Sequence, residues 1–76
     1  MEINDFVQKF AEQFDETEVS RFMPETRFRD LEEWTSIIGL SIILMVDEEY
    51  GINLEAADFQ KANTIEELFN IVQTKA

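Results

Sequence analysis

The chain has no cysteine and no histidine among its 76 residues. Without cysteine it can form no disulfide, no thiolate metal site and no cysteine nucleophile. Without histidine it lacks the commonest general base and the commonest nitrogen ligand for metal ions. Neighbouring carboxylates such as Glu66 and Glu67 point in different directions on a helix, so they would attract a divalent cation only weakly. We therefore expect no catalytic residue and no defined metal site.

Basic residues are also scarce, since 6 Lys and Arg face 17 Asp and Glu and give a formal net charge of −11. The segment from Asp30 to Gln60 holds eight acids and no base. Such a surface repels phosphate, which argues against nucleic-acid binding. It suits protein partners with Arg and Lys patches, because complementary charge speeds encounter and fixes orientation. The simpler alternative is that the charge only keeps a small domain in solution.

Long apolar runs are missing too, and no stretch approaches the roughly 18 residues of a membrane span. The N-terminal sequence from Met1 to Asp5 is acidic and lacks the basic region of a signal peptide. The length fits one domain over residues 1–76. With 45% hydrophobic residues and seven Phe, that domain can form a real but small core. We expect a single, monomeric, cytoplasmic domain.

The apolar residues that are present follow helical spacing and predict no strand. A first helix over residues 3–14 has one apolar face made by Ile3, Phe6, Val7, Phe10 and Phe14. The segment 15–35 has no sustained period and contains Pro24, so it reads as a long loop. About twenty residues without structure are unusual in a compact domain. We therefore expect apolar residues of the loop to hold it on the core, namely Val19, Phe22, Met23, Phe28 and Leu31.

A second helix is predicted over Ser36–Tyr50, ending at Gly51. One side is expected to face the core and carries Gly39, Ile42, Ile43, Val46 and Tyr50. A different side carries Ile37, Leu40, Ser41, Leu44, Asp47 and Glu48, and Ile38 and Met45 extend the apolar surface further. Either the 15–35 loop covers this second side, or it is an apolar docking face with an acidic rim.

The C-terminal third of the chain predicts two more helices. Asn53 could cap a short third helix over residues 55–59. Thr64 and Glu67 form a capping-box pattern that opens a fourth helix, whose apolar face carries Ile65, Leu68, Phe69 and Val72. The fold class is therefore all-α, a small four-helix bundle with a long loop between the first two helices and a short third helix. Arginines cluster in that loop and could tie it to the acidic helices, namely Arg21, Arg27 and Arg29.

Taken in order, these segments resemble the acyl carrier proteins of the phosphopantetheine-binding family. The resemblance covers nearly the whole chain and includes residues 26–31, the tetrapeptide 34–37, the acidic helix end 47–52 and the helix start 63–68. The modified serine of that family normally sits in an Asp-Ser-Leu triplet. The matching position in this chain is Ser36.

The resemblance implies that Ser36 is esterified by 4′-phosphopantetheine, which a phosphopantetheinyl transferase takes from coenzyme A. The thiol of this arm would hold acyl groups as thioesters for enzymes of fatty acid, polyketide or related biosynthesis. The carrier itself would have no catalytic group. Its partners would be the transferase and acyl-transferring or acyl-modifying enzymes with basic patches. They would recognise a surface made by Thr35, Ile37, Leu40, Ser41, Leu44, Asp47 and Glu48.

Four positions depart from the family pattern. Thr35 and Ile37 replace the Asp and Leu of the triplet, and Ser41 stands where fatty-acid carriers often have an acid. Trp34 stands where those carriers have a small residue. These changes indicate a specialised or accessory carrier. The alternative function is an acidic helical interaction module without the cofactor, in which Ser36 is only a helix cap.

Overall fold

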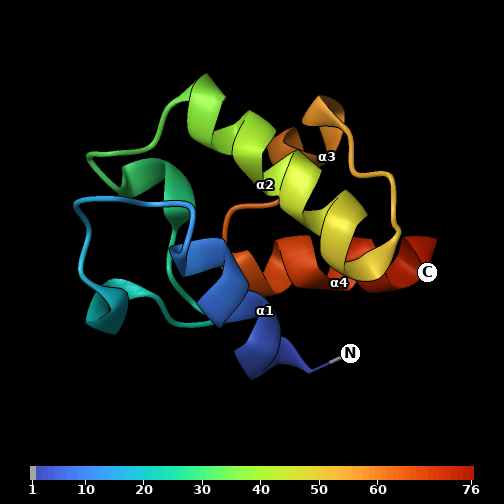
Figure 1. Cartoon of the computed structure of the whole chain (residues 1–76), viewed down its shortest axis with the longest axis horizontal. Helices are drawn as coiled ribbons and strands as arrows, with labels where there is room; N and C mark the ends of the chain where they lie inside the picture. The colour runs from blue at the N-terminus through green and yellow to red at the C-terminus, as the bar shows by residue number, and fades with distance from the viewer. Residues whose placement is uncertain (1) are drawn as a thin grey trace.

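Helices are the only regular elements in the described part of the chain, residues 2–76 of this computed structural model (Figure 1). The four α-helices are α1 (Ile3–Ala11), α2 (Ser36–Tyr50), α3 (Ala56–Gln60) and α4 (Ile65–Lys75). Two short 3₁₀ helices lie between α1 and α2, η1 (Val19–Arg21) and η2 (Phe28–Asp30). The all-α prediction, the long connection and the short third helix are confirmed.

The predicted end of the first helix at Phe14 is wrong, because α1 ends at Ala11. The N–H groups of Gln13 and Phe14 bond to the carbonyls three residues back, at 3.2 and 3.0 Å. This tighter turn still directs Phe14 into the core, where its ring lies 4.9 Å from that of Phe22. The predicted apolar face is buried at Phe6, Val7, Phe10 and Phe14 and partly buried at Ile3.

The bounds predicted for the second helix are confirmed. Gly51 ends α2 in the left-handed conformation with φ 66°, and its N–H bonds to the Asp47 carbonyl. The cap at the other end is Thr35, whose extended backbone allows Oγ1 to accept from the N–H of Ile38 at 3.3 Å. Ser36 is already inside the helix. A capping role for Ser36 is therefore wrong.

The core side of α2 follows the sequence prediction with one addition. Gly39, Ile42 and Val46 are buried, and Ile43 and Tyr50 are partly buried. Met45 is also buried, although the sequence pattern did not place it on the core side of the helix. The extra burial arises because α2 packs on both α1 and α3.

The predicted cap of the third helix is wrong. α3 begins one residue later than predicted, and its cap is Glu55, whose N–H donates to Oδ2 of Asp58 at 2.8 Å. Asn53 instead accepts a hydrogen bond on its carbonyl from Lys75. The fourth helix is confirmed, because Thr64 Oγ1 accepts from the N–H of Glu67 at 3.1 Å. All four residues of its predicted apolar face are buried, namely Ile65, Leu68, Phe69 and Val72.

The connection between α1 and α2 is held on the core by Phe22, Phe28 and Leu31, as predicted. The prediction is wrong for Val19 and Met23, which are 71% and 50% exposed. Both lie close to Phe22 in the sequence. Because a tight turn presents only one side to the core and the Phe22 ring occupies that side, Val19 and Met23 face solvent.

Of the arginines in this connection, Arg29 joins it to the end of α3. The Arg29 guanidinium donates to the carbonyls of Phe59 and Ala62 at 2.6 and 2.7 Å and to the side chain of Asn63 at 2.7 Å. Neither Arg21 nor Arg27 forms an ion pair within residues 2–76. The expected tie to the helices is therefore made by one arginine, and its acceptors are carbonyl groups and an amide oxygen.

Candidate functional site

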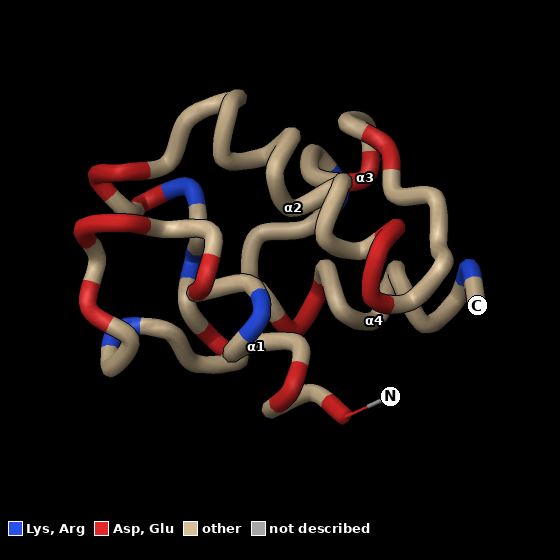
Figure 2. The backbone as a smooth tube through the Cα atoms, in the orientation of Figure 1, with Lys and Arg blue, Asp and Glu red and all other residues tan. Residues whose placement is uncertain are grey.

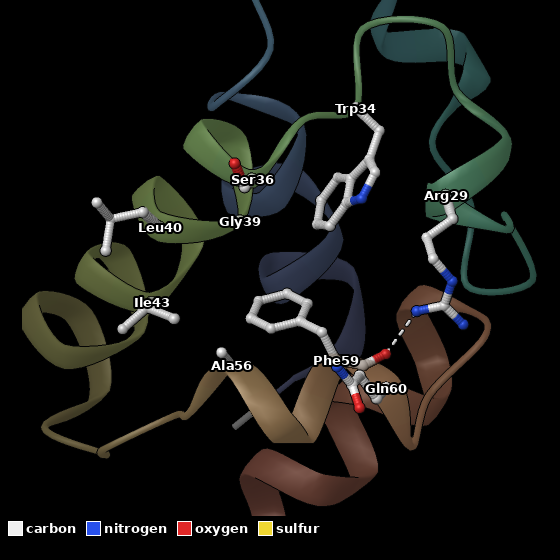
Figure 3. Close-up of a pocket in the computed structure, with 9 residues that line it drawn as sticks. All are labelled: Arg29, Trp34, Ser36, Gly39, Leu40, Ile43, Ala56, Phe59 and Gln60. Atoms are coloured by element: carbon white, nitrogen blue, oxygen red, sulfur yellow. Dashed lines mark hydrogen bonds between the residues drawn. The ribbon is translucent and has the colours of Figure 1, made fainter.

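Ser36 is exposed at the first position of α2, where the long connection enters the helix (Figure 3). Because Thr35 makes the capping hydrogen bond, the Ser36 hydroxyl is not needed for that task. The first turn of α2 contains no acidic residue. Its unpaired backbone N–H groups and the partial positive charge of the helix start therefore favour an anion beside Ser36.

The acid closest in sequence to this helix start, Glu33, is engaged elsewhere. Its carboxylate accepts from the N–H groups of Asp15 and Glu16 at 2.8 and 3.0 Å and from the Thr17 hydroxyl at 2.7 Å. The hydrogen bond from Thr17, followed by those from the backbone, holds the pKa of Glu33 below its usual value. Glu33 therefore stays ionised as part of the loop.

An apolar pocket of about 370 Å³ opens beside Ser36, between α2 and α3 (Figure 3). Gly39, Leu40 and Ile43 line it from α2, and Ala56 and Phe59 line it from α3. Trp34 contributes its indole ring, and Arg29 and Gln60 are polar residues at its edge. No acid is among the described residues that line this pocket, although the chain carries 17. An anionic group next to Ser36 would therefore meet no electrostatic repulsion from the walls of the pocket.

The outer side of α2 carries large apolar side chains in contact with solvent. Ile37, Leu40 and Leu44 are 73%, 56% and 55% exposed, and Asp47 and Glu48 are exposed beyond them. Figure 2 shows that one end of α2 is acidic, and the sequence places Asp47, Glu48 and Glu49 there. Of the residues expected on this side, Ser41 is partly buried, and Thr35 at the helix start is exposed. Of the two alternatives for this side of α2, covering by the 15–35 loop is therefore wrong.

Sequence reasoning missed the pocket and three residues that line it, Ala56, Phe59 and Gln60. It singled out Trp34 only as a departure from a family pattern. Gly39 lies beside the Trp34 ring, but a methyl group at that position would lie 3.6 Å from Cη2, an ordinary contact distance. Gly39 is therefore not required by Trp34, and the sequence carried no clear signal for the pocket.

Two further properties concern the described residues as a whole. Residues 2–76 contain no group of three or more Asp and Glu side chains placed to hold a metal ion. No helix among them has both the length and the apolar character needed to cross a membrane.

Comparison with known proteins bears on the family of the chain. No curated protein and no solved structure matches the chain. The family model described as the phosphopantetheine attachment site matches residues 4–72, which include Ser36 and reach into α4. An exposed serine at an acid-free helix start fits such a group. Since the match covers most of the chain, the protein belongs to this family of phosphopantetheine carriers, to which 4′-phosphopantetheine is covalently attached.

Proposed function

We propose that Ser36 is the residue esterified by 4′-phosphopantetheine and that the chain is an acyl carrier protein. The placement of the Ser36 hydroxyl, exposed at the start of α2 and free of the capping role, carries this proposal. The chain has two other serines. Ser41 is partly buried in the middle of α2, and Ser20 lies in the short η1 turn. Neither has the start of a long helix beside it.

The residues around Ser36 would hold the arm through its phosphodiester. The unpaired N–H groups of the first turn of α2 would bind the negative charge, and the Thr35 cap keeps that turn in place. The bound arm supplies a thiol that carries acyl groups as thioesters. The chain presents this cargo and leaves the chemistry to partner enzymes, in line with the scarcity of catalytic side chains.

The partner surface in this proposal is the outer side of α2. Ile37, Leu40 and Leu44 supply exposed apolar contacts, and Asp47 and Glu48 supply negative charge at one end. Such a patch suits enzymes with an apolar hollow bordered by Arg and Lys. Thr35 and Ser41 complete the surface near Ser36. We infer that the phosphopantetheinyl transferase and the acyl-handling enzymes dock here.

The pathway part of the proposal is a specialised or accessory carrier in fatty acid, polyketide or related biosynthesis. Its support is the loss of negative charge near Ser36, where Thr35 and Ser41 stand in place of acids. Each surface charge contributes only about 0–1 kcal/mol to an interaction. The changes should therefore alter partner choice more than they impair loading. A monomeric, cytoplasmic protein remains a prediction of this proposal.

Intact-protein mass spectrometry tests the attachment residue. The chain is incubated with coenzyme A and a broad-specificity phosphopantetheinyl transferase, beside Ser36→Ala and the matched control Ser20→Ala, which lies outside the proposed docking surface. We expect the wild type and Ser20→Ala to gain one phosphopantetheine and Ser36→Ala to gain none. Loading of Ser36→Ala would move the site to another residue. Failure of the folded wild type with several transferases would favour the cofactor-free interaction module.

A further inference from the structure

The largest side chain that lines the pocket beside Ser36 is that of Trp34. Its ring lies against the α2 backbone at Gly39, where a methyl group would be 3.6 Å from Cη2. Its centroid is 5.8 Å from that of Phe59 on α3. The indole therefore spans the space between the two helices that form the pocket (Figure 3).

Behind Trp34 lies the aromatic core. Its ring stacks parallel to that of Phe10 at 6.5 Å and lies 4.9 Å from that of Phe28. Phe10 and Phe28 have no exposed surface, whereas Trp34 is only partly buried. One side of the indole thus faces the pocket and the other side faces the core. Trp34 is the partition between them.

We propose that Trp34 sets the length of the acyl group that the pocket can shelter. This inference rests on the proposed attachment of the arm to Ser36, whose side chain also lines the pocket. The volume of about 370 Å³ is near the lower end of the range of roughly 300–1,000 Å³ for small-molecule sites. The indole blocks extension of this space toward Phe10. The ligand class is therefore an apolar acyl group whose buried part ends at the indole, and longer chains leave their ends in solvent.

The charged residue at the pocket edge is consistent with an apolar occupant. The Arg29 guanidinium faces the end of α3 and donates to the carbonyls of Phe59 and Ala62. Its hydrogen bonds hold one wall of the pocket in position. The remaining walls are mainly carbon surface from Gly39, Leu40 and Ile43.

The length of acyl chain that the pocket buries can be measured from the rate at which hydroxylamine cleaves the thioester. A sheltered thioester is cleaved by hydroxylamine only when the acyl group leaves the pocket. Each methylene that the pocket buries should slow this cleavage by about fourfold, from the transfer of a CH₂ group out of water. The rate should fall with each added carbon until the pocket is full and then become constant. The chain length at which it becomes constant measures the depth of the pocket.

The experiment loads straight acyl groups from butyryl to dodecanoyl onto the carrier and follows hydroxylamine cleavage by intact mass spectrometry. Fluorescence of the single tryptophan provides a second readout in the wild type. We expect the rate to become constant at a chain length within this series. In Trp34→Leu and Trp34→Ala the cleavage rate should become constant only at longer chains. It should fall about fourfold for each additional methylene that the enlarged pocket buries. Phe69→Leu, which shortens a buried side chain of α4, is the matched control and should behave as the wild type.

Several outcomes would overturn the inference. Rates that do not depend on chain length, or the same limiting length in wild type and Trp34→Leu, would show that Trp34 does not set the depth. An equal shift in Phe69→Leu would assign the effect to general loosening of the core. Circular dichroism checks that each variant is folded, and Trp34→Leu keeps an apolar contact if Trp34→Ala does not fold. Absence of any loading on the wild type would instead refute the attachment proposal.

Discussion

The two helices that form the pocket beside Ser36 are held by different kinds of interaction. α2 has a cap at each end, and four of its residues are buried in the core. α3 has only five residues, and polar groups hold both of its ends. Arg29 binds its C-terminal carbonyls, and Lys75 binds the Asp58 carboxylate at 2.9 Å and the Asn53 carbonyl at 3.2 Å. The pocket therefore has one wall held mainly by apolar burial, and a second wall that has Phe59 in the core but is held at its ends by polar groups.

The largest effect should come from the core side of α2. Ile42 is completely buried, so Ile42→Ala removes apolar contacts and leaves a cavity. We expect a loss of about 2–5 kcal/mol in the free energy of unfolding, measured by urea denaturation. In a domain of this size, α2 and the remaining helices should unfold together. Stability close to the wild type would show that α2 does not anchor the fold.

Arg29→Gln tests a local effect, in which the structure of α3 is weakened while the core stays folded. The change removes charged donors from the carbonyls of Phe59 and Ala62. Hydrogen exchange at residues 56–62 should accelerate by about tenfold, the size expected from losing a charged hydrogen bond. Exchange in α2 should change much less. Arg21→Gln is the control, and equal acceleration in α2 and α3 would contradict a separately held wall.

The start of α2 offers a third test, because Thr35 and Ser36 are adjacent and have different roles. Thr35→Ala removes the acceptor for the Ile38 N–H and should cost about 0.5–2 kcal/mol. Ser36→Ala should change the free energy of unfolding by less than about 0.5 kcal/mol, as expected for an exposed site without a special contact. Thermal and urea denaturation would measure both. A larger loss of unfolding free energy in Ser36→Ala than in Thr35→Ala would show that Ser36 is the cap.

A pH dependence is expected at α3. Burial alone would raise the pKa of Asp58, but the hydrogen bonds from Lys75 and from the Glu55 N–H outweigh it and keep the pKa below its usual 3.8. Asp58 therefore stabilises the fold above that value, and the contribution disappears as the pH falls through the lower folded-state pKa. We expect Asp58→Asn to be less stable than the wild type by about 1 kcal/mol at neutral pH. The difference should shrink in acid, as measured by urea denaturation at a series of pH values. A constant difference would assign the effect to packing.

The order and approximate bounds of the helices could be predicted from the sequence, because the signals that define them are local. The apolar run that ends at Gly51 defines α2, and the Thr64–Glu67 pattern defines the start of α4. The errors occur where neighbouring residues compete for one role. Thr35 and Ser36 are both good caps, and only the backbone conformation decides between them. In the same way, no period in the loop indicates that Phe22 is buried while Val19 is exposed.

The candidate site was predictable only in part. Ser36 and the outer side of α2 follow from spacing along one helix together with the family resemblance. The pocket depends on how Trp34 and Phe59, which are far apart in the sequence, meet across α2 and α3. Pairings of this kind depend on tertiary packing, and a single sequence gives no direct signal for them.

The small size of the exposed apolar stripe on α2 has a kinetic consequence. Only Ile37, Leu40 and Leu44 contribute large apolar surface there. If enzymes dock on this stripe as proposed, the acids near its end would speed their approach, while the few apolar contacts would give little resistance to departure. Complexes of this carrier should then be short-lived. Such a turnover of partners would let one molecule visit successive enzymes without a separate release step.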